Sequence, residues 1–74
     1  MDLNTRAGRA IREARQAAGL SRERLLTRAG HPVTLRWLVA LEQGRATWRL
    51  DVFETLAKAL DREPAALLVT ERAA

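Results

Sequence analysis

Three glycines and two prolines divide the chain into short segments, and this division constrains the fold more than any other feature of the sequence. Gly19, Gly30 and Gly44 each follow a stretch in which apolar residues recur every three or four positions, the period of an amphipathic α-helix. Glycine in such a place is typical of a helix C-terminus. Pro32 prevents a helix from continuing, and Pro64 suits the first turn of a new one. We therefore expect several short helices and no strand.

Five helices are expected within a single domain spanning residues 4–70. Ser21 and Thr34 stand immediately before two of the periodic segments, where their side chains can cap a helix N-terminus. Residues 1–3 and 71–74 are expected to be frayed ends. The helices are expected at about 4–18, 22–29, 34–43, 50–60 and 64–70. The fourth helix is expected to turn its apolar stripe inward, namely Leu50, Phe53, Leu56, Ala57 and Leu60.

The composition limits the class of protein. With 74 residues, of which 47% are hydrophobic and 30% charged, the chain is typical of one small globular domain rather than of a disordered segment. It has no cysteine and a single histidine, so we expect no disulfide, no metal site and no cofactor.

Enzymes and membrane proteins are also excluded by the sequence pattern. His31 lies in a turn with no serine or cysteine nucleophile and no paired carboxylates nearby, so we expect no enzymatic activity. The first residues lack the apolar core of a signal peptide, and no apolar run is long enough to span a membrane. We therefore expect a soluble, cytoplasmic protein without a membrane partner.

The charge is distributed unevenly along the chain. Residues 1–49 contain ten arginines and four acidic residues, whereas residues 50–74 contain three basic and five acidic residues. Twelve of the thirteen basic residues are arginine, whose planar guanidinium group suits phosphates and guanine edges. The asymmetry favours a polyanion facing the N-terminal half, and an ordinary solvated surface is the alternative interpretation.

Several short motifs resemble those of a known family. They are Gly19-Leu20-Ser21, Ala29-Gly30, Leu41-Glu42-x-Gly44 and Leu56-Ala57-x-Ala59-Leu60. From about Gly8 to Leu68 the chain resembles the Cro and lambda-repressor type helix-turn-helix domains, also called the xenobiotic-response-element family. The resemblance implies an all-α, five-helix bundle of the lambda-repressor-like DNA-binding type. In such a bundle the third helix enters the major groove of double-stranded DNA, usually from a dimer on a palindromic operator.

The chain departs from the family pattern at three places. His31 and Pro32 are an apparent two-residue insertion in the turn between the second and third helices. Leu26 occupies a position that is usually alanine in the family, and together with the longer turn it is expected to move the third helix outward. The third helix carries a single obvious base-reading side chain, Arg36, and is otherwise mostly apolar.

The third helix supplies the candidate base-reading residues. Arg36 is placed to donate to guanine O6 and N7, and a phosphate contact is its alternative role. Ala40 is expected to contact thymine methyl groups, as are Leu35 and Val39, which could equally complete the core. The resemblance further implies a partly buried ion pair between Arg15 and Glu42 that joins the first and third helices.

The candidate phosphate contacts surround this helix. Trp37 could donate its indole N–H to the DNA backbone, but packing of its ring between the second and third helices is the favoured interpretation. Trp48 is expected to pack over the junction of the third and fourth helices. Arg22 stands at a helix N-terminus, where free N–H groups and the helix dipole favour an anion. The full candidate set is Arg9, Arg22, Thr34, Trp37, Gln43, Arg45 and Arg49.

Leu67 and Leu68 of the fifth helix are expected to turn inward. The segment after Pro64 is nevertheless more apolar than one short helix can bury against its own core, and we expect a weak homodimer through Pro64, Leu67 and Leu68. Altogether the sequence predicts a sequence-specific DNA-binding transcriptional regulator, expected to be a repressor, that reads the major groove with helix 34–43. The alternative hypothesis is a helix-turn-helix domain that docks a protein partner through the apolar face of that helix.

Overall fold

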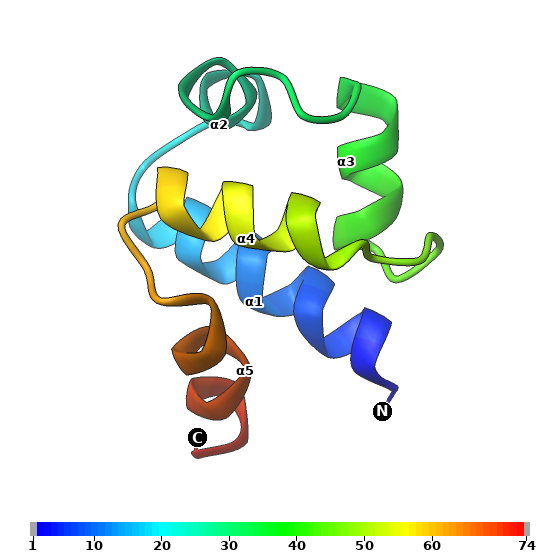
Figure 1. The fold of residues 1–74 in the computed structure, drawn as a ribbon, viewed down its shortest axis with the longest axis vertical. Coiled ribbons are helices and arrows are strands. Elements are labelled where there is room, and N and C mark those ends of the chain that lie inside the picture. The colour runs from blue at the N-terminus through cyan, green and yellow to red at the C-terminus, as the bar shows by residue number, and fades with distance from the viewer. Residues whose placement is uncertain (1, 74) are drawn as a thin grey trace.

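The computed structural model describes the backbone of residues 2–73 and the side chains of residues 2–68, and every regular element in that part of the chain is an α-helix. This confirms the all-α class. The helices have nearly the expected bounds and are drawn in Figure 1: α1 Leu3–Ala17, α2 Arg22–Ala29, α3 Leu35–Glu42, α4 Leu50–Ala59 and α5 Pro64–Ala73.

The ends of the chain are more regular than the sequence predicted. The Asp2 side chain caps α1 by accepting a hydrogen bond of 2.8 Å from the backbone N–H of Thr5, so the helix begins at Leu3. The helix α5 extends to Ala73, three residues beyond its expected end. Residues 1 and 74, which were also expected to fray, lie outside the described residues.

The turn between α2 and α3 is set by local hydrogen bonds. Gly30 adopts a left-handed conformation (φ 81°) at the end of α2, and His31 follows it in the same region (φ 56°). The backbone N–H of His31 donates to the carbonyl of Leu26 at 2.8 Å, which satisfies one of the last acceptors of α2. Ser21 and Thr34 cap α2 and α3 as predicted.

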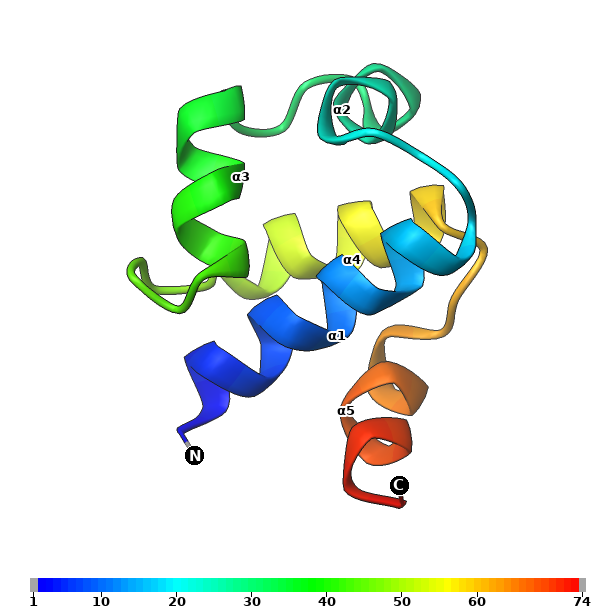
Figure 2. The same ribbon diagram turned by 180° about the vertical axis from the view of Figure 1, so that it is seen from behind.

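The bundle is built around α1 and α4, which lie side by side through the middle of the molecule in both views (Figures 1 and 2). The helix α3 stands across one end of this pair, α2 packs over α4, and α5 packs on α1 and α4 from the opposite side. The largest fully buried side chains are Ile11, Leu25, Leu38, Leu41 and Leu56.

One predicted core residue faces solvent. Leu50 is 79% exposed, whereas Val52, two residues later, is buried. Leu50 is the first residue of α4, and helical side chains lean toward the N-terminus, so this one extends past the end of the helix and away from the core.

The helices α1 and α3 approach each other most closely at Gly8. A Cβ atom added there would collide with the backbone carbonyl oxygen of Leu41, and two backbone atoms of Glu42 lie 3.2 Å away. Glycine is therefore required at this point of α1 for space rather than for backbone conformation, since the residue is helical.

We expect Gly8→Ala to destabilise the fold by about 2 kcal/mol, because α3 must shift to admit the methyl group. Helix propensity alone predicts that Gly8→Ala stabilises the fold, since alanine in a helix interior is favoured over glycine by about 1 kcal/mol. The free energy of unfolding in urea measures the difference. The pair Glu13→Ala and Glu13→Gly, at an exposed position inside α1, is the control for propensity alone. A Gly8→Ala variant more stable than the wild type would contradict the close approach.

The hydrogen bond from Thr5 also lowers the pKa of the Asp2 carboxyl. The ionised Asp2 carboxylate therefore stabilises the fold fully above the unfolded-state pKa. This stabilisation is lost as the pH falls through the lower folded-state pKa. Asp2→Asn keeps an acceptor but cannot titrate. We therefore expect its unfolding midpoint to fall less than that of the wild type as the pH is lowered. Thermal unfolding between about pH 2 and pH 6 tests this. Identical pH profiles for the two proteins would show that the titration of Asp2 does not contribute to the acid destabilisation.

Candidate nucleic-acid interface

The helix α3 is divided lengthwise into a core face and an outer face. Leu38 and Leu41 are buried against the bundle, and Glu42 is buried with them. On the opposite side Arg36 and Gln43 are exposed. Three further positions lie at the border: Val39 and Ala40 are half-buried, and Leu35 is 40% exposed. Trp37, the remaining one of the eight residues, is 50% exposed. The outer face therefore combines one guanidinium group with small and apolar side chains.

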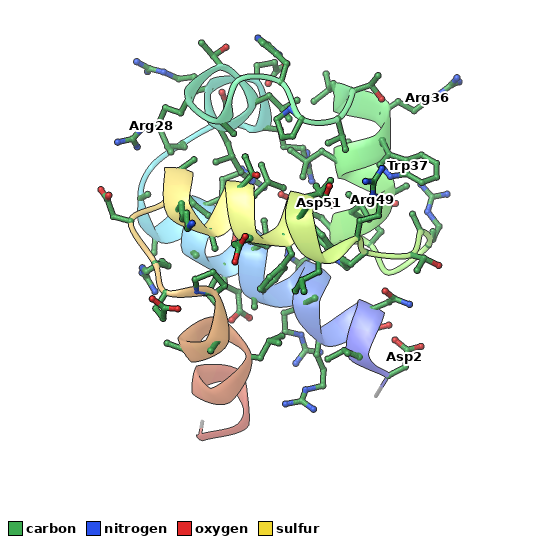
Figure 3. All side chains as sticks on the ribbon, in the orientation of Figure 1. Asp2, Arg28, Arg36, Trp37, Arg49 and Asp51 are labelled. Atoms are coloured by element: carbon green, nitrogen blue, oxygen red, sulfur yellow. The ribbon has the colours of Figure 1, made fainter. Side chains whose placement is uncertain are left out.

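Trp37 does not pack between α2 and α3, so the favoured interpretation of its role was wrong. Half of its surface is exposed, and Figure 3 shows it with Arg36 on the side of α3 that faces away from the bundle. Trp48 packs as predicted: its ring meets the ring of Phe53 edge-on, with centroids 5.4 Å apart. Its backbone N–H donates to the side-chain oxygen of Asn4 at 2.8 Å, which ties the connector after α3 to α1.

The candidate phosphate contacts are distributed around both ends of α3. Thr34 accepts the capping hydrogen bond from Trp37 through its hydroxyl oxygen and retains the hydroxyl proton for a further acceptor. Arg45 is exposed after the C-terminal end of the helix. Arg49 is 77% exposed and forms a surface ion pair of 2.9 Å with Asp51. Arg9 is half-buried on α1.

An ion cluster joins three helices behind this face. The predicted pair is present: Arg15 donates to the two carboxylate oxygens of Glu42 at 2.9 and 3.2 Å, with both side chains buried. The sequence reasoning missed the third member. The Nε of Arg22 donates to the same carboxylate at 2.9 Å, so this arginine, predicted only as a phosphate contact, also supports α3.

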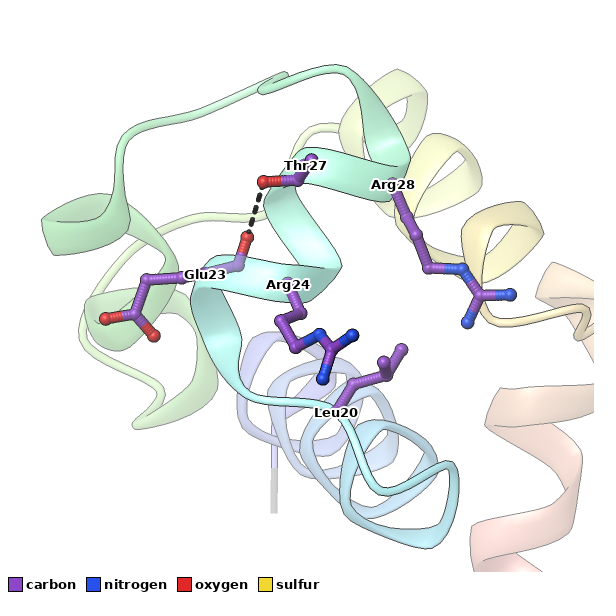
Figure 4. Close-up of a pocket in the computed structure, with 5 residues that line it drawn as sticks. All are labelled: Leu20, Glu23, Arg24, Thr27 and Arg28. Carbon is purple, nitrogen blue, oxygen red and sulfur yellow. Dashed lines mark hydrogen bonds between the residues drawn. The ribbon is translucent and has the colours of Figure 1, made fainter.

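Two shallow grooves flank α2. One lies toward α3, under the turn, and Leu26 forms part of its wall although the residue as a whole is buried. The other, drawn in Figure 4, adjoins the first along Glu23 and Thr27, which line both grooves. Its charged residues include Arg24 and Arg28, which are exposed and have no ion-pair partner in the described part of the chain. The lining of this second groove is Leu20, Glu23, Arg24, Thr27 and Arg28.

The expected dimer contact needs correction at one residue. Leu67 is 5% exposed and belongs to the core of its own chain, so it has no surface to offer to a second copy. Leu68 is half-buried against the same core, and its carbonyl accepts a hydrogen bond of 3.3 Å from Arg6. Pro64 is also half-buried. Leu67 therefore turns inward as expected of the fifth helix, and it does not fit the expected dimer contact.

Comparison of the chain with protein-family models, with curated proteins and with solved structures found no match. The resemblance to the Cro and lambda-repressor type domains therefore stays a prediction. Among the described residues, no helix is long and apolar enough to cross a membrane, and no group of three or more acidic or histidine side chains is placed to hold a metal ion.

We expect the loss of one partner to destabilise the fold far more at the buried ion pair than at the exposed one. Arg15→Met removes two of the three hydrogen bonds of a buried carboxylate and should cost about 3 kcal/mol. Arg49→Met removes only the exposed pair with Asp51 and should cost less than about 1 kcal/mol. Urea unfolding of both variants gives the comparison, and equal losses would show that the cluster is not what holds α3 in place.

Proposed function

We propose that this protein is a sequence-specific regulator of transcription, acting as a repressor, with a fold of the lambda-repressor-like DNA-binding type. The observation that carries the proposal is the outer face of α3, where Arg36 projects into solvent from the first turn of a helix anchored by a buried ion cluster. A rigid helix with an exposed arginine near its N-terminus is the arrangement that major-groove recognition uses.

In this proposal the two kinds of contact have separate roles. Arg36 donates to guanine O6 and N7, and the border residues Leu35, Val39 and Ala40 approach thymine methyl groups. Phosphates are held by groups at both ends of α3, which set the register without reading sequence. These groups are Arg9, Arg22, Thr34, Trp37, Gln43, Arg45 and Arg49.

Two copies would bind a palindromic operator. Half-sites one helical turn apart place the two recognition helices about 34 Å from each other. The longest dimension of the molecule is 29 Å, which allows two copies to sit side by side at that spacing. Pro64 and Leu68 leave only a small surface for contact between the copies, which is consistent with a weak dimer that forms on the operator.

Protein docking is the second candidate function. Trp37 is 50% exposed and Leu35 is 40% exposed, an unusual amount of apolar surface for a helix that reads polar base edges. Salt separates the two functions, because binding through several phosphates weakens steeply as salt rises, whereas apolar docking changes little.

The proposal predicts that Arg36 is the side chain that distinguishes the operator from other DNA sequences. After selection of bound sequences from random duplex DNA, Arg36→Ala should reduce the preference for the selected duplex over a base-substituted one by about 1–3 kcal/mol. Arg62→Ala removes the same charge beyond the end of α4 that lies farther from α3, and it should leave the preference unchanged. Fluorescence titrations with both duplexes measure this.

Two outcomes would count against the proposal. If Arg36→Ala lowers affinity for both duplexes equally, Arg36 contacts phosphate and does not read bases. If the wild type binds no duplex even at low salt, DNA binding is excluded and protein docking becomes the better explanation of the exposed face.

A further inference from the structure

The buried cluster contains one carboxylate and two guanidinium groups. The side chain of Glu42 is fully buried, and its two oxygens accept hydrogen bonds from Arg15 and Arg22. Arg15 is also bonded to the carbonyl of Leu20 through Nη1 at 2.9 Å, so all three of its nitrogens are engaged. The cluster therefore has one positive charge in excess of its carboxylate.

The excess charge is directed toward solvent through Arg22. Its side chain is 34% exposed, compared with 8% for Arg15. Only its Nε is hydrogen-bonded within the described part of the chain, which leaves the two terminal amino groups without a protein acceptor. A guanidinium group held through Nε retains four N–H donors in one plane, the geometry that fits a phosphate.

We propose that Glu42 is a positioning residue that fixes Arg22 by its Nε, so that the terminal amino groups bind one phosphate of the DNA backbone. This inference rests on the proposed function and adds to it a link between the anchoring of α3 and the binding of a phosphate. The same carboxylate that anchors α3 to α1 also orients a phosphate-binding group at the start of α2. Because Arg22 is held before binding, it loses less side-chain freedom when the phosphate arrives.

The exposed arginines of α2 provide the contrast. Arg28 lies six residues further along the same helix, with no ion-pair partner among the described residues (Figure 4). It carries the same charge as Arg22 without being held by Glu42. Arg28→Lys therefore gives the effect of exchanging arginine for lysine where Glu42 holds nothing, and the effect of the same exchange at Arg22 is compared with it.

The first experiment keeps the charge and changes the donor geometry. In Arg22→Lys, a single ammonium group replaces the planar fork and cannot both pair with Glu42 and present paired donors to a phosphate. We expect the slope of log K against log salt for a duplex to become shallower by about 0.9, the value for one lost phosphate contact. Arg28→Lys should leave the slope unchanged. Equal slopes for Arg22→Lys and the wild type would overturn the proposal.

In the second experiment, the proposal and simple electrostatics predict opposite changes in DNA affinity. Glu42→Gln removes a negative charge, which by long-range electrostatics alone should strengthen binding to DNA. If Glu42 positions Arg22, the variant should bind more weakly than the wild type although its net charge is higher. Stronger binding by a Glu42→Gln protein whose circular dichroism shows it to be folded would overturn the proposal. If this variant does not fold, the Arg22→Lys comparison decides the matter.

A third measurement, without DNA, separates this proposal from the proposed function. Thermal unfolding is followed in sodium phosphate and in sodium chloride at equal ionic strength. A phosphate ion bound at Arg22 should raise the midpoint of the wild type and of Arg28→Lys, but not that of Arg22→Lys. Phosphate stabilisation without any duplex binding would reject the DNA-binding function and leave the anion site. Equal stabilisation of all three proteins would reject the anion site.

Discussion

The buried carboxylate of Glu42 is the interaction on which the arrangement of the first three helices depends. It accepts hydrogen bonds from Arg15 on α1 and from Arg22 on α2, so the end of α3 is fixed to both of its neighbours at one point. An eight-residue helix is not stable alone in water, so α3 requires such anchoring. The approach of α1 at Gly8 lies beside the same residue, which means that steric fit and charge compensation act together there.

This anchoring leaves the opposite face of α3 available for a partner. Three of its eight residues are buried, and the others lie at the border or in solvent. The helix therefore needs little of its own surface to stay in place. The exposed side chains, Arg36 and Trp37 among them, contribute little to the core, and the proposed functions make use of them.

Local signals were sufficient to predict the helices, because each is begun or ended by groups close in sequence. The hydroxyls of Ser21 and Thr34 accept from N–H groups three residues away, and Gly30 ends α2 in a left-handed conformation. The depth of individual side chains was less predictable. Leu50 fits the stripe of α4 but stands at its first residue and faces solvent, and Trp37 was expected between α2 and α3 but is half exposed.

The sequence by itself determined the all-helical class, the order of the helices with most of their ends, and, through the family resemblance, the pairing of Arg15 with Glu42. Each follows from residues near one another in the chain or from a known motif. Only the tertiary structure decided that Arg22 joins that pair and that Trp37 is half exposed. These depend on distances between helices that are separate in sequence, and a helical period specifies which way a side chain points but not what lies opposite it.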